Sequence, residues 1–126
     1  MKISEIYKVA VSLCGSTDQE EYADFAVDIF NQMLGECFNE NNHLRQSKGF
    51  EKLAAVAEVE NMEEEFPYEG ELKTAFRYGL AAKLLIANDD MDEGKYAIYL
   101  QLCTSGIDRL ANRAIEESVV DVYANS

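Results

Sequence analysis

Apolar residues surround almost the whole circumference of one helix-length stretch near the middle of the chain. From Leu80 to Ala87 every residue except Lys83 is apolar, so a helix built from this stretch must be covered on nearly every side. Gly79 stands just before the run, although Gly costs about 1 kcal/mol relative to Ala inside a helix. We therefore expect a central helix after the break at Pro67, with another backbone packed closely against it at Gly79.

Two amphipathic patterns precede this central stretch. The first covers residues 3–14, with Ser4 as a candidate N-cap and Gly15 as a candidate left-handed terminator. The second begins after Thr17, which has a Glu three residues later as in a capping box, and ends near Phe38. Its length of about 20 residues corresponds to about 30 Å of helix. The sequence thus predicts a short helix followed by a long one.

The segment between the second pattern and the central stretch has no clear period. Residues 39–49 are polar and rich in Asn, which is typical of a loop. Residues 54–60 combine Ala, which favours helix, with Val, which favours strand. We expect a loop at 39–49 and leave 54–60 open between a short helix and a strand pair.

A fourth helical pattern follows the acidic turn at residues 88–92, where Asp90 and Glu93 again stand in a capping-box relation. Arg113 and Glu117 have the i,i+4 spacing of an exposed ion pair. The residues expected to be buried are Tyr96, Tyr99, Leu100, Cys103, Ile107, Leu110, Ala111 and Ala114.

The last nine residues change character. Val119, Val120, Val122 and Tyr123 favour strands, yet no turn and second strand lie beside them. They are our candidate partner-binding residues, on an arm that adds to the edge of another protein. A frayed terminus is the alternative. The sequence therefore predicts an all-α, compact bundle of about four helices with a short extended C-terminal tail. Residues 1–117 form the helical domain and residues 118–126 the arm.

Charge and composition limit the classes of function. The chain has 24 acidic and 11 basic residues and a net charge of −13, whereas duplex DNA binding depends on Lys and Arg. No apolar run approaches the roughly 20 residues that span a bilayer, and no signal peptide pattern opens the chain. We expect an intracellular protein that neither binds DNA grooves nor enters a membrane.

Cysteine and aromatic residues have ordinary structural interpretations. Cys14, Cys37 and Cys103 are far apart in the sequence, and such cysteines in an intracellular protein are expected to be reduced and buried. The aromatic residues around the central stretch are expected to pack in the core, or in part to anchor a subunit interface. They are Tyr68, Phe76, Tyr78, Tyr96 and Tyr99.

No group of residues supports catalysis or cofactor binding. Glu40 and His43 have the spacing of half a di-iron motif, but the chain has one His and cannot complete it; His43 is expected in an exposed loop. Residues 89–94 resemble a calcium loop, but Met91 and Leu100 stand where oxygen ligands are needed. We predict a protein that is not an enzyme, with no catalytic, metal or cofactor site. The acidic residues of the second helix are expected on a solvated face: Glu20, Glu21, Asp24 and Asp28.

The central stretch resembles the head–tail connector (adaptor or head-completion) proteins of tailed bacteriophages. The similarity consists of a Pro-Tyr step, an acidic turn, an alanine-rich helix, a second acidic turn and an aromatic-rich helix. The order of elements is similar over most of residues 1–111, whereas residues 40–60 lack the pattern and the tail is shorter than in some relatives. The matching residues are Pro67, Tyr68, Glu71, Leu72, Tyr78 to Leu85, Asp89, Asp90 and Tyr96 to Leu102, with Leu13-Cys14-Gly15 and Met33-Leu34 in the preceding helices.

This resemblance implies a structural protein of the virion, present in the host cytoplasm during assembly. Connectors of this kind form a homo-oligomeric ring, typically about twelve-fold, beneath the portal protein. The ring extends the DNA channel and docks the tail or the next connector. An acidic lining would repel phosphates, so DNA would pass without specific binding. The alternative is a small acidic cytosolic regulatory or DNA-mimic protein that binds a basic partner, because residues 53–72 hold seven Glu and no basic residue.

Overall fold

The computed structural model describes the chain except residues 17–19, 21, 88–92 and 125–126, and beyond Leu110 the description concerns the helical backbone. The described residues contain five α-helices and no strand beyond an isolated bridge between Lys2 and Glu65. The all-α class is therefore confirmed. The elements are α1 (Ile3–Leu13), α2 (Ala23–Glu36), α3 (Phe38–Ser47), the 3-10 helix η1 (Gly70–Leu72), α4 (Lys73–Ala87) and α5 (Glu93–Ala124).

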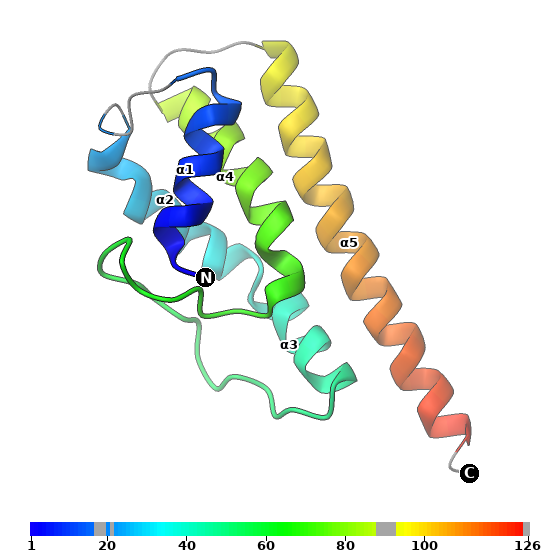
Figure 1. The fold of residues 1–126 in the computed structure, drawn as a ribbon. Coiled ribbons are helices and arrows are strands. Elements are labelled where there is room, and N and C mark those ends of the chain that lie inside the picture. Colours follow the sequence, from blue (N-terminus) through cyan, green and yellow to red (C-terminus); the bar gives the residue numbers. More distant parts are fainter. Residues whose placement is uncertain (17–19, 21, 88–92, 125–126) are drawn as a thin grey trace.

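Helix α4 lies at the centre of the bundle, as expected. Figure 1 shows α1 and α2 on one side of α4 and α5 along the other, with α3 below α2. Eight of its residues are buried, and they lie on almost every side of the helix. In the run from Leu80 to Ala87, Lys83 is the one charged residue. The buried residues are Ala75, Phe76, Gly79, Leu80, Ala81, Ala82, Leu84 and Leu85.

Backbone groups of the irregular segment around residues 62–64, and not a side chain, cap the start of α1. The N–H groups of Ile3 and Ser4 donate to the carbonyl oxygens of Glu64 (3.0 Å) and Met62 (2.8 Å). The residue before the helix is Lys2, without a side-chain cap, so the prediction of Ser4 as the N-cap is wrong. The helix needs no capping side chain, since the irregular segment already satisfies its first donors. Its other end is as predicted, with Gly15 at φ +83°.

The predicted second helix corresponds to α2, which ends at Glu36, close to the expected end near Phe38, but begins only at Ala23. A further helix, α3, follows directly after Cys37. The predicted capping box at Thr17 lies outside the described residues. Residues 39–49 were expected as a loop, but most of them form α3. The Asn-rich composition is explained by hydrogen bonds that Asn41 and Asn42 make to other segments.

Three buried or half-buried Asn side chains hold the irregular segment 48–69 on the helices. Asn31 accepts from the N–H of Val59 (2.8 Å) and donates to its carbonyl (2.9 Å). Asn42 accepts from the N–H of Leu53 (2.8 Å), and Asn41 from that of Glu69. Because side chains satisfy these backbone groups, residues 54–60 adopt neither the helix nor the strand pair considered from the sequence.

The aromatic residues divide into two groups. Phe30, Phe66, Tyr68 and Phe76 pack in the core with ring centroids 5.0–6.4 Å apart, an arrangement that stabilises beyond the area buried. Tyr78 and Tyr99 form a separate, half-buried pair at 5.8 Å.

Helix α5 packs on α4 and then continues past the rest of the bundle (Figure 1). Cys103 and Ile107 are buried as predicted, and Tyr96, Tyr99 and Leu110 are half-buried, but Leu100 is exposed. The side chains of Ala111, Ala114, Arg113 and Glu117 lie outside the description. Tyr99 Oη donates to the carbonyl of Leu13 (2.8 Å), which ties α5 to the end of α1.

The predicted extended tail is helical as far as Ala124. Val119, Val120, Val122 and Tyr123 are therefore on the backbone of α5 and not on an extended arm. Helix propagation explains the error, since each added residue gains a hydrogen bond once a helix exists. The strand preference of Val costs only a few tenths of a kcal/mol in a helix. Their proposed role in binding a partner stays a prediction.

Candidate functional site

Three helices pack closely together at Gly79. A Cβ atom built on Gly79 would lie 2.7 Å from Cys103 Sγ on α5 and 2.7 Å from Met33 Cε on α2. Real Cβ atoms do not come this close to other heavy atoms. The close approach expected from the sequence is thus confirmed, and it involves side chains from two neighbouring helices.

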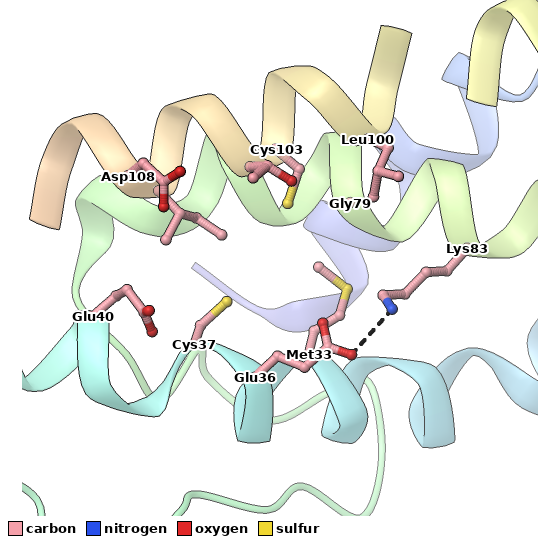
Figure 2. Close-up of a pocket in the computed structure, with 11 residues that line it drawn as sticks. Met33, Glu36, Cys37, Glu40, Gly79, Lys83, Leu100, Cys103 and Asp108 are labelled. Carbon is pink, nitrogen blue, oxygen red and sulfur yellow. Dashed lines mark hydrogen bonds and ion pairs between the residues drawn. The ribbon is translucent and has the colours of Figure 1, made fainter. Parts of the chain in front are cut away.

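A cavity of about 200 Å³ opens beside this contact. We call it the inter-helix cavity; it lies between α4, α5 and the junction of α2 with α3 (Figure 2). Its inner part is lined by buried residues, and Leu100 and Thr104 of α5 are exposed at its outer part. The buried residues are Met33, Cys37, Gly79, Cys103 and Ile107. Four charged side chains complete the lining: Glu36, Glu40, Lys83 and Asp108.

The charged side chains occupy two ends of the inter-helix cavity. At one end, Lys83 Nζ donates to Glu36 Oε1 at 3.2 Å (Figure 2). At the other end lie Glu40 of α3 and Asp108 of α5. Glu40 Oε2 is buried and has no hydrogen-bond donor among the described residues. One end of the cavity is therefore internally neutralised and the other is acidic.

The two thiols between these ends are protonated at neutral pH. Burial, reinforced by Cys103, Glu40 and Glu36, raises the pKa of the Cys37 thiol to about 12. Burial also raises the pKa of the Cys103 thiol to about 11. A thiol is nucleophilic as the thiolate, so this pair is unsuited to nucleophilic catalysis. The third thiol, Cys14, donates to the carbonyl of Ala81 (3.3 Å), and the prediction of buried, reduced cysteines is confirmed.

The residues weighed as metal ligands do not assemble into a site in the part of the chain that the structure describes. There, no three His, Cys, Asp or Glu side chains are grouped to hold a metal ion. His43 is half-buried on α3 and not in an exposed loop. Most of the calcium-like segment lies outside the described residues. On the acidic face of α2, Glu20, Asp24 and Asp28 are exposed as expected, and Glu21 is not described.

A second hollow, of about 310 Å³, lies on the other flank of α5, against the start of α4. We call it the α4–α5 hollow; its lining includes Tyr78, Leu102, Arg109 and Leu110. On the same part of α5, Ile98 is 57% exposed, Leu102 44% and Leu100 37%. This part of α5 therefore presents apolar side chains that the described chain leaves uncovered.

Sequence reasoning identified Gly79 and considered Glu40 only as half of a di-iron motif, and it did not predict that four charged residues line one cavity. Glu36, Glu40, Lys83 and Asp108 come from four helices and share no motif. The signal that could have been used was Lys83, the single charge in the run from Leu80 to Ala87, since a charge among apolar residues favours a partner of opposite charge.

Comparisons with protein-family models, with curated proteins and with solved structures found no match to this chain. Among the described residues, no helix combines the length and the apolar character that crossing a membrane requires.

Proposed function

We propose that this chain is a structural virion protein that forms an oligomeric ring beneath the portal of a tailed bacteriophage. The observation that carries the proposal is the uncovered apolar surface on α5. Of eight large hydrophobic side chains exposed in the described chain, Ile98 and Leu102 stand four residues apart on one face of this helix. Clustered exposed apolar residues mark protein interaction sites, whereas scattered ones do not.

The shape of the molecule is compatible with such a ring. Helix α5 has 32 residues, about 48 Å at 1.5 Å per residue, and its C-terminal part projects beyond the bundle (Figure 1). A projecting helix can contact a neighbouring subunit or the portal without disturbing the core of its own domain. The resemblance of residues 67–102 to head–tail connectors supports a ring that surrounds the DNA channel. An acidic surface on this channel would repel the phosphates, so DNA would pass without binding.

The contacts of the acidic segment weigh against the DNA-mimic alternative. Glu63 pairs with Lys2 (3.3 Å), Glu65 with the N-terminal ammonium (2.8 Å) and Glu69 with Lys48 (3.2 Å). Two further glutamates, Glu64 and Glu71, bind backbone N–H groups and Lys48. Five of the seven carboxylates in 53–72 thus interact within the chain, and the basic groups that they pair with reduce the negative charge that this segment could offer a basic partner.

Native mass spectrometry and electron microscopy test the ring. The purified chain is measured alone and after mixing with the cognate portal ring. We expect closed oligomers in the mixture, whether or not the chain also forms them alone. Ile98→Asp and Leu102→Asp should abolish them by placing charges in the apolar interface. Val9→Asp, at an exposed apolar position on α1, is the matched control. A monomer under both conditions, or equal assembly of all variants, would contradict the proposal.

A further inference from the structure

The inter-helix cavity has the dimensions of a site for one side chain. Its volume of about 200 Å³ lies below the roughly 300–1,000 Å³ of pockets that hold drug-sized ligands or cofactors. Two of its lining residues on α5, Leu100 and Asp108, are exposed, so the cavity reaches the surface along this helix. A long side chain with an apolar stem could therefore enter it, with the stem against apolar atoms and the polar head at one end.

The charges determine which head group fits. Lys83 is already paired with Glu36, so it does not compensate Glu40 and Asp108 at the opposite end. Glu40 Oε2 is buried without a donor in the described chain, and a buried acceptor left in this state destabilises the protein. The two thiols of the cavity stay neutral. A cationic donor is the group that these carboxylates lack.

We propose that the inter-helix cavity receives a Lys or Arg side chain from a basic partner protein. The methylene stem packs against Cys103 and Ile107, which line the cavity beside its acidic end, as the stems of Lys and Arg do on apolar surfaces. The cationic head lies between Glu40 and Asp108 and donates charge-assisted hydrogen bonds to them. Because this chain has 24 acidic and 11 basic residues, the partner is a different, basic protein and not a second copy. The proposal does not depend on ring formation.

Peptide titration followed by NMR tests this site. The methyl carbon of Met33, labelled with ¹³C, reports from the cavity wall, and the probe is the capped tripeptide Leu-Arg-Leu. Saturable shifts of the Met33 methyl signal are expected with this peptide. The capped tripeptide Leu-Gln-Leu has the same apolar flanks and should bind with an affinity at least about tenfold lower. A hydrogen bond to a charged group stabilises a complex more than a neutral one, and the difference in free energy corresponds to about this factor.

Charge-removing variants locate the cation. Glu40→Gln and Asp108→Asn should each weaken the Arg peptide about tenfold, and Asp28→Asn, an exposed acid on α2, should leave its affinity unchanged. In the free protein, Glu40→Gln should leave the midpoint of chemical unfolding unchanged or raise it, because Oε2 lacks a donor. A purely structural carboxylate would instead lower that midpoint.

Three outcomes would overturn the proposal. Equal binding of the Arg and Gln peptides would show that the cavity does not select a cation. Equal weakening by Asp28→Asn would assign the effect to the net charge of the chain. Binding of free argininamide as tightly as the peptide would indicate a small cationic ligand and not a partner protein.

Discussion

Cys103 Sγ occupies the space that a side chain at position 79 would require, since a Cβ atom on Gly79 would lie 2.7 Å from it. This contact sets the separation of α4 and α5 at the level of the inter-helix cavity. The sulfur atom of a short side chain cannot move far without moving the helix that carries it. Gly79 therefore fixes how closely the central helix and α5 pack.

Substitution of Gly79 by Leu should destabilise the protein by roughly 1–3 kcal/mol, the usual cost of overpacking a core. Chemical denaturation measures the change. Gly35→Ala is the matched control, because nothing lies within 4 Å of a Cβ at that position; it should stabilise by about 0.5–1 kcal/mol through helix propensity alone. If Gly79→Leu were as stable as the parent, the packing argument would be wrong.

Removal of the Asn31 side chain should release the segment around Val59. Asn31→Ala leaves the N–H and carbonyl of Val59 without their partner and should cost about 1–3 kcal/mol of unfolding free energy. Hydrogen exchange at the Val59 amide should accelerate in parallel. Gln32→Ala, at the exposed neighbouring position, should change neither quantity, and unaltered exchange in Asn31→Ala would show that the hydrogen bonds do not hold the segment.

The ion pair between Glu71 and Lys48 should make stability depend on pH. The hydrogen bond from Lys48 lowers the pKa of Glu71 below its usual 4.5, so its contribution is present above pH 4.5 and is lost as pH falls through the lowered value. Glu71→Gln should reduce stability at pH 7 by at most about 1 kcal/mol, because the pair is partly exposed. The two proteins should become equally stable at low pH. A difference that persists in acid would refute the assignment.

The protein should bind duplex DNA no better than background at moderate salt. Its 24 acidic residues outnumber its 11 basic ones, and binding to phosphates depends on positive charge. Fluorescence anisotropy with a labelled duplex is the measurement. Binding that weakens steeply as salt rises would defeat an acidic channel lining and revive a role in nucleic-acid recognition.

Deletion of residues 118–126 should leave the domain folded but prevent its attachment to portal-bearing heads. The core residues that the structure describes end at Ile107, with Leu110 packed against them, so circular dichroism should show a normal domain that has lost only the end of α5. Electron microscopy of assembly reactions then scores attachment. A truncated protein that completes heads as well as the full chain would remove the C-terminal segment from the proposed interface.

The sequence determined the helical class, the central position of α4 and the close contact at Gly79. These features follow from local period and from an apolar run whose burial is obligatory. The turn at Gly15 was equally predictable, since a positive φ favours Gly. In each case the cause lies within a few residues of the effect.

Only the tertiary structure decided the rest. The capping of α1 by Met62 and Glu64 depends on a segment about sixty residues away. Asn41 and Asn42 favour a loop by composition, yet they lie in α3 because their side chains bind residues 53 and 69. The acidic end of the inter-helix cavity combines Glu40 with Asp108 from another helix. Such pairings depend on how the helices pack, and helical period along the chain carries no information about them.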